Sequence, residues 1–343
     1  MNRANPHENN SRIGTAVLLL IALTCALSAQ ELQREQSTRT LSVNVDAVEA
    51  TATVVDRAGH FVTGLEKENF QIFEDKVPQQ IAYFSSEDVP VSVGIVLDVS
   101  GSMKEKLTTA VKAAITFMKN GNRDDEYSLV EFADRPADIA DFTGDIMKIQ
   151  TRLMLSRAKG ETALYDAVYK GLNKVSEGNN AKRALLLITD GEDNRSRYTY
   201  SNVKEFVREK DVQMYAIGIS DGWNSYEADQ GRALLRKLAS LSGGNAFFPP
   251  SVQELENICR LIAKELKNQY VIGYYSTNTA IDGQWRKIKV AAEDKKAKLT
   301  VRATRLLCAK PGRIAQCVSK VINEHFETDE SYVDTVSAIT GGK

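Results

Sequence analysis

The spacing of hydrophobic and polar residues changes twice along the chain. Between residues 41 and 84 apolar and polar residues alternate, which is typical of strands with one buried face. Between residues 91 and 267 short, continuous apolar segments alternate with segments of helical spacing. From residue 270 to 304 strand-like alternation returns without helices in between. The pattern therefore predicts a domain of alternating strands and helices, flanked on both sides by antiparallel strands.

In the first of these regions the apolar positions shift by one residue near Ala47, which predicts a bulge or a strand break there. Residues 56–59 read as a turn. A second turn at Asp75-Lys76 is expected to lead from the strand 70–73 into the strand 81–84. This β unit is too small to be stable alone, so we expect it to pack against further strands.

In the middle region, strands covered on both faces should read as nearly continuous apolar segments. The segments 91–97 and 184–188 fit this description, and further strands are predicted at 127–133, 137–142, 212–219 and 245–248. The helices predicted between them are 103–118, 144–155, 163–177, 202–210, 231–241 and 252–267. This order predicts a doubly wound, mostly parallel α/β sheet of the Rossmann-like kind.

The strands near 270–275, 285–290 and 299–304 have no helices between them, so they cannot continue a parallel sheet. We expect them to join the strands of 41–84 in one smaller antiparallel β-sandwich, with the α/β domain inserted between its strands. The expected segments are a signal peptide 1–28, a disordered leader 29–40, a β subdomain 41–88, the α/β domain 90–268, completing strands 269–305 and a tail 306–343 with a short helix.

The first 29 residues have the three parts of a secretory signal. Arg3 and Arg12 lie in a polar start, the apolar segment 13–27 follows, and small residues allow cleavage after Ser28 or Ala29. The alternative is a retained membrane anchor, although the apolar segment has about 15 residues and a membrane-spanning helix needs about 20. We therefore expect an exported protein of the periplasm, the cell envelope or the medium, with membrane contact only if the segment is retained.

Composition narrows the function further. Lys and Arg number 44 against 45 Asp and Glu, a net charge of −1, so nucleic acid is not an expected partner. The chain has three histidines, too few for a His-rich zinc site. Apart from Cys25, the cysteines are Cys259, Cys308 and Cys317. Cys308 and Cys317 are the possible disulfide, and buried free thiols are the alternative.

Hydroxyl and carboxylate side chains follow the buried strands of the α/β region. Asp98, Ser100 and Ser102 end the first strand, Thr162 enters a helix, and Asp190 ends the second apolar strand. In an open α/β sheet, ligands bind at the carboxyl ends of the strands, near the point where the strand order reverses. An oxygen-only set suits Mg²⁺ or Mn²⁺ and does not suit zinc or copper. Taken alone, however, Asp-x-Ser-x-Ser also occurs where such residues simply cap helices.

This set of residues resembles the metal-ion-dependent adhesion site of von Willebrand factor type A domains, and the similarity spans residues 90–268. The segments 62–103 and 270–290 further resemble exported acidobacterial proteins related to that family. The resemblance implies a complete motif with Asp98, Ser100, Ser102, Thr162 and Asp190 as direct or water-mediated ligands. It also implies that an Asp or Glu of a protein partner completes the coordination. A degenerate domain that binds no metal is the alternative.

We therefore expect an exported, non-catalytic protein that binds a protein partner through Mg²⁺ or Mn²⁺ and takes no small-molecule substrate. One alternative is a structural envelope component with a fold-stabilising metal, and another is a metal-dependent hydrolase. Against hydrolysis, Ser100 stands where a second Asp would be needed, and His60 and His325 are far from it in sequence. Nucleophile-elbow and phosphate-loop motifs do not occur in the sequence.

Several neighbouring residues have a simpler explanation than metal binding. The acidic residues Asp166, Glu192 and Asp193 are expected to be helix-turn and loop residues rather than ligands. The polar segment 220–231 either borders the recognition face or is an ordinary surface loop, and the sequence leaves both readings open.

Overall fold

The computed structural model describes residues 47–308, apart from 191–192, 220–225, 250, 279, 281, 283, 294–298 and 303. The predicted signal peptide, the leader, the tail helix, and the side chains of Cys308 and Cys317 lie outside the described part. Within that part, no helix is both long enough and apolar enough to cross a membrane.

The central sheet has six strands in the order β10-β9-β8-β5-β6-β7, and it is parallel except for β7, which runs antiparallel to β6. The strands are β5 (Val91–Asp98), β6 (Glu126–Phe132), β7 (Pro136–Thr143), β8 (Lys182–Thr189), β9 (Gln213–Gly218) and β10 (Ala246–Phe247). The strand order reverses at β5, because β6 lies on one side of it and β8 on the other. The carboxyl ends of β5 and β8 are therefore where a doubly wound sheet places its ligands.

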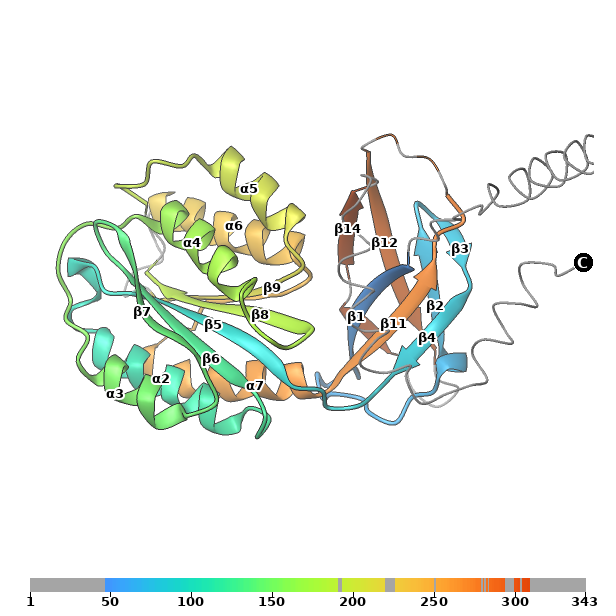
Figure 1. Ribbon diagram of the computed structural model, residues 1–343, viewed down its shortest axis with the longest axis horizontal. Coiled ribbons are helices and arrows are strands. Elements are labelled where there is room, and N and C mark those ends of the chain that lie inside the picture. Colours follow the sequence, from blue (N-terminus) through green and yellow to red (C-terminus); the bar gives the residue numbers. More distant parts are fainter. Residues whose placement is uncertain are drawn as a thin grey trace, which may run out of the picture. The chain divides into compact units, whose positions relative to one another are not determined.

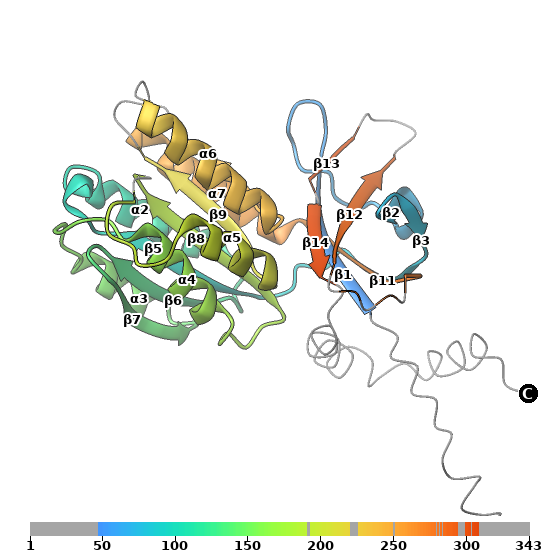
Figure 2. The same cartoon turned by 90° about the horizontal axis from the view of Figure 1, so that it is seen from above.

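Helices cover both faces of this sheet (Figures 1 and 2). They are α2 (Leu107–Asn120), α3 (Ile146–Met154), α4 (Leu164–Val175), α5 (Tyr200–Glu209), α6 (Tyr226–Leu241) and α7 (Leu255–Lys267). Helices α2, α3 and α7 share one apolar core with the sheet, and α4, α5 and α6 share the other. All eight residues of β5 are buried as a result, which explains its nearly continuous apolar sequence.

Two four-stranded antiparallel sheets form a second unit, in the orders β13-β1-β11-β4 and β14-β12-β2-β3. The strands are β1 (Ala47–Val55), β2 (Phe70–Glu74), β3 (Val77–Gln79), β4 (Ile81–Ser85), β11 (Gln269–Tyr275), β12 (Trp285–Ala292), β13 (Thr300–Arg302) and β14 (Thr304–Cys308). Side chains from both sheets enclose one apolar core, including Val54 and Ile272, each 0% exposed. The predicted fold class is confirmed: strands from before and after the α/β domain build this sandwich.

The predicted connection after the second turn is wrong. Asp75 and Lys76, with φ of 46° and 73°, do form a tight turn, but it leads into the short strand β3, which pairs with β2. Strand β4 pairs with β11 in the opposite sheet. Pro78 explains why β3 is an edge strand, because proline cannot donate a hydrogen bond to a further neighbour.

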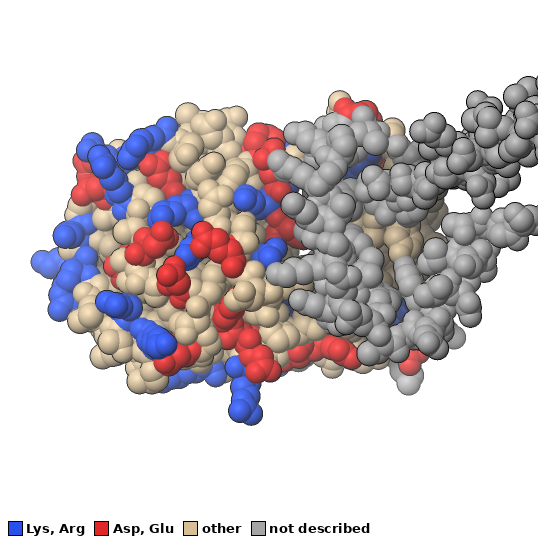
Figure 3. Space-filling model, viewed as in Figure 1, with Lys and Arg blue, Asp and Glu red and all other residues tan. Residues whose placement is uncertain are grey.

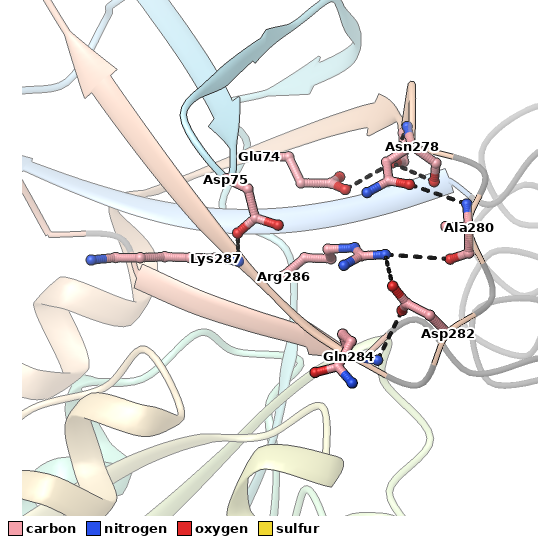
Figure 4. A network of polar contacts seen from close by, with 9 residues as sticks. Glu74, Asp75, Asn278, Ala280, Asp282, Gln284, Arg286 and Lys287 are labelled. Atoms are coloured by element: carbon pink, nitrogen blue, oxygen red, sulfur yellow. Dashed lines mark hydrogen bonds and ion pairs between the residues drawn. The ribbon is translucent and has the colours of Figure 1, made fainter.

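Polar groups tie the loops of the sandwich together (Figure 4). The carboxylate of Glu74, which is 3% exposed, accepts hydrogen bonds from the hydroxyl of Tyr274 at 2.7 Å and from Oγ of Ser276 at 2.9 Å. Arg286 forms an ion pair with Asp282 at 2.9 Å in the loop before β12. The backbone N–H of Gln284 and then the Arg286 guanidinium lower the pKa of Asp282. This unit thus satisfies its buried and loop carboxylates internally.

The close approach of α4 to the sheet gives a test of the packing. A Cβ at Gly171 would lie 2.5 Å from Cγ2 of Val96 and 2.8 Å from Cδ1 of Leu185, both fully buried. We expect Gly171→Ala to lower the free energy of unfolding by about 1–3 kcal/mol in urea denaturation, because of overpacking. An exposed helical glycine would instead gain about 1 kcal/mol on the same change. Asn173→Ala, on the exposed side of α4, is the control and should change stability little. A Gly171→Ala variant as stable as the wild type would contradict this packing.

Candidate metal and adhesion site

Strand β5 ends at Asp98, whose side chain is fixed at the edge of the sheet. Asp98 is 0% exposed because helices cover both faces of the strand. Its Oδ1 accepts a hydrogen bond from the backbone N–H of Ser100 at 2.8 Å, and its Oδ2 accepts one from Oγ1 of Thr189 at 2.7 Å. Thr189 is the last residue of β8, so the carboxylate connects the ends of the two neighbouring strands. Both carboxylate oxygens keep further lone pairs for a ligand.

Burial makes the negative charge of Asp98 unfavourable and raises its pKa to about 6. The hydrogen bonds from Ser100 and Thr189 oppose this shift, and the nearby charge of Asp190 adds to it. Two carboxylates at adjacent strand ends therefore create a negative site that a cation would relieve.

The turn after β5 brings two hydroxyl groups together. Oγ of Ser100 lies 3.0 Å from Oγ of Ser102, and a short 3-10 turn, Gly101–Met103, begins between them. Ser100 is 1% exposed, whereas Ser102 is exposed. One serine of this pair is thus buried, and the other is accessible from the surface.

Thr162 lies on the loop that enters α4, and it is 3% exposed. Its backbone N–H donates to Oδ1 of Asn194 at 2.8 Å, and its carbonyl accepts from the backbone N–H of Asn194 at 3.0 Å. The same loop is joined to the turn after β5, because the N–H of Gly101 donates to the carbonyl of Gly160 at 2.9 Å. Backbone hydrogen bonds therefore hold the three segments that carry the predicted ligands side by side. In the described residues the Thr162 hydroxyl makes no hydrogen bond to the other four predicted ligands.

Asp190 directly follows β8, and its Oδ2 lies 3.5 Å from Nζ of Lys106. The side chains are mostly buried, with 9% of Asp190 and 12% of Lys106 exposed. The sequence analysis did not single out Lys106. A lysine four residues after Ser102 is unremarkable in sequence, and its partner follows a different strand.

The neighbouring acids Asp166, in the first turn of α4, and Asp193, in the loop after β8, accept hydrogen bonds from that loop. Asp166 is 8% exposed, and its Oδ1 accepts from the backbone N–H groups of Arg197 at 2.9 Å and Tyr198 at 3.0 Å. Asp193 accepts from Oγ of Ser196 at 2.5 Å. Both carboxylates fix the loop between β8 and α5. Glu192 and most of the segment 220–231 lie outside the described residues.

The donor set of the site is suited to a hard divalent cation. All its side-chain donors are oxygens, which Mg²⁺ and Mn²⁺ prefer. Adjacent ligands of an octahedral Mg²⁺ lie about 2.9 Å apart when each bond is about 2.1 Å. The 3.0 Å between the Ser100 and Ser102 hydroxyls is compatible with that spacing. No group of three or more His, Cys, Asp or Glu side chains that could hold a metal occurs in the described residues, and a site built from two carboxylates and three hydroxyls would not contain one.

Comparison with known proteins agrees with this architecture. The family model of the von Willebrand factor type A domain matches residues 92–260. With its six-stranded sheet between two layers of helices, the matched segment has the α/β fold expected of that domain.

Solved structures with a similar chain come from several bacteria. The conserved hypothetical protein BatB from Bacteroides thetaiotaomicron is 20% identical, with 52% of this chain and 99% of that chain covered and a TM-score of 0.43. A von Willebrand factor type A protein from Catenulispora acidiphila is 14% identical, with 82% and 80% covered and a TM-score of 0.46. The vWF domain of the type V pili tip protein Mfa5 from Porphyromonas gingivalis is 13% identical, with 52% and 95% covered and a TM-score of 0.44. No curated protein matches the chain.

The raised pKa of Asp98 predicts how stability depends on pH without metal. Between its ordinary pKa of 3.8 and about 6, Asp98 binds more protons in the folded than in the unfolded state. The free energy of unfolding should therefore fall as the pH rises through this window, by up to about 3 kcal/mol from this group. Urea unfolding in EDTA from pH 4 to 7 measures the change. Asp98→Asn should remove this contribution, and parallel pH profiles of variant and wild type would contradict the prediction.

Proposed function

We propose that this chain is an exported, non-catalytic protein that binds a protein partner through a divalent cation held at the carboxyl edge of the central sheet. Asp98, Ser100, Ser102, Thr162 and Asp190 would hold Mg²⁺ or Mn²⁺, directly or through water. The observation that carries the proposal is the gathering of buried Asp98, the paired hydroxyls of Ser100 and Ser102, and Asp190 where the strand order reverses.

The coordination chemistry supports a partner with an acidic side chain. If each of the five side chains binds through one oxygen, together they supply five of the six ligands that Mg²⁺ takes, and one position stays open. Ser102 is exposed, so a partner's side chain could reach this end of the ligand set. A carboxylate of a partner would complete the coordination and add negative charge, and Mg²⁺ tolerates exchange of a bound water at such a position.

The charges around the site favour the same kind of partner. The exposed cations on the loops at this edge include Lys104, Lys159, Arg195 and Arg197. Among the described residues they outnumber the exposed acids of these loops, which include Glu105 and Glu161, and Glu161 pairs with Arg195 at 3.3 Å. Figure 3 shows Lys and Arg side chains gathered at the left end of the domain, toward which β5 and β8 run in Figure 1. An acidic partner surface would be attracted to this edge, and the attraction would weaken with salt.

The proposals of export and of a non-catalytic role are supported by the N-terminal sequence and by the position of His60. The signal-like residues 1–29 support export to the periplasm, the envelope or the medium. His60, the histidine in the described part, has a side chain 79% exposed and contacts Asp56 in the loop after β1, so it offers the site no general base. A structural envelope role for the same metal is the alternative that the partner experiment separates.

Calorimetric titration of Mg²⁺ and Mn²⁺ tests the metal. We expect saturable binding by the wild type and its loss, more than tenfold in affinity, in Asp98→Ala, because a buried ligand and its charge are removed. Glu105→Gln is the matched control: Glu105 is exposed on the same loop, outside the predicted ligand set, and its variant should bind metal like the wild type. A folded wild type that binds neither ion would refute the proposed mechanism.

Asp190→Ala tests the partner. In a pull-down from cell-envelope proteins, we expect the wild type to retain a partner in Mg²⁺ and to release it in EDTA. The variant should fold, as judged by circular dichroism, yet fail to retain the same protein, because the ion is no longer held for the partner's carboxylate. If the folded variant retained that partner unchanged, binding would not run through the metal, and the structural alternative would be favoured.

A further inference from the structure

The ion pair between Lys106 and Asp190 places a positive charge of the chain itself within the proposed metal site. Nζ of Lys106 lies 3.5 Å from Oδ2 of Asp190, and both side chains are largely shielded from water, with 12% and 9% exposed. An ion pair so shielded is screened much less by salt than one on the open surface. Lys106 therefore compensates one of the two negative charges at this edge.

Local preferences do not explain a lysine at this position. Lys106 is the N-cap residue of α2, a helix of 14 residues, and its side chain makes no capping hydrogen bond. Serine, threonine, aspartate and asparagine are favoured at N-cap positions, where the backbone is usually extended. Lys106 instead has a helical backbone, with φ of −98° and ψ of −23°. A cation is also disfavoured at this end of a helix, where the helix dipole is positive. The ion pair with Asp190 is a contact of the tertiary structure that favours lysine here.

We propose that Lys106 is a built-in counter-ion, which occupies the Asp190 carboxylate in the metal-free protein and which a divalent cation must displace. The inference rests on the proposed function, because it concerns the same site. In the absence of metal the ammonium group reduces the repulsion between Asp190 and buried Asp98. In the presence of metal it competes for the same carboxylate. Lys106 therefore weakens metal binding and stabilises the metal-free protein.

This dual role predicts effects of opposite sign in one variant. Lys106→Met keeps the length and the apolar stem of the side chain but removes its charge. In EDTA its Tm should fall by about 2–4 °C, because Asp190 loses its counter-ion. Its affinity for Mn²⁺ in calorimetric titration should rise by about five- to tenfold, because the competing charge is gone. A residue that merely supported the loop would lower both stability and affinity.

Lys104→Met is the matched control. Lys104 lies two residues earlier in the same turn but is exposed. Removal of a solvent-screened charge should change the Mn²⁺ affinity by less than about twofold. The comparison therefore separates the specific contact with Asp190 from a general decrease in positive charge.

The outcomes distinguish this inference from the proposed function. Equal or weaker Mn²⁺ binding by Lys106→Met than by a metal-binding wild type would overturn the counter-ion role and leave the metal site standing. Tight binding by Lys106→Met alone, with little binding by the wild type, would support the counter-ion role. If neither protein bound Mn²⁺ or Mg²⁺ while both were folded, the proposed function itself would fall, and the inference with it.

Discussion

The fully buried carboxylate of Asp98 is the constraint around which this edge of the molecule is arranged. Burying a charged group is unfavourable unless hydrogen bonds or opposite charges compensate it. The protein supplies one hydrogen bond from the end of β8, through Thr189, and one from the turn after β5, through Ser100. These bonds do not restore an ordinary pKa, which stays at about 6. The site therefore retains a deficit of positive charge, and this deficit gives the surrounding hydroxyls and Asp190 their chemical significance.

The topology of the sheet brings these groups together from distant parts of the sequence. Strands β6 and β8 lie on opposite sides of β5, and doubly wound sheets place their ligands at such a reversal of the strand order. Backbone hydrogen bonds then fix the loops: Val99 donates to the carbonyl of Phe132 at 2.8 Å, and Gly101 donates to that of Gly160 at 2.9 Å. The segments that carry Ser100, Ser102 and Thr162 are thus joined through their main chains.

Much of this arrangement could be predicted from the sequence, because its signals are strong and local. A nearly continuous apolar strand such as 91–97 requires cover on both faces, and repeated alternation with helices requires a parallel sheet. The juxtaposition of Asp98 and Asp190 followed from that fold, since parallel strands end at one edge. That these residues bind metal stays a prediction.

The differences between prediction and structure have physical reasons. Strand β3 has three residues, including Pro78, and such a segment is hard to distinguish from a turn. Helix α6 begins at Tyr226, whereas the sequence pattern predicts a start near residue 231. The prediction missed the first turn because residues 226–230 carry little apolar periodicity. The role of Lys106 depends on a pairing between separate loops, which the pattern of neighbouring residues does not encode.

Lysine is unfavourable at the start of a helix, so Lys106 indicates that a tertiary contact determines the residue at this position. Sequences generally agree with the local preferences of the elements they form, and the exceptions are expected at functional or strained sites. Here a cation stands at the start of α2, and its ammonium group contacts Asp190, which follows β8. The ammonium group stabilises the negative charge of Asp190. Lys106 therefore compensates part of the negative charge at this edge without a metal, and any divalent cation bound there has to compete with this ammonium group.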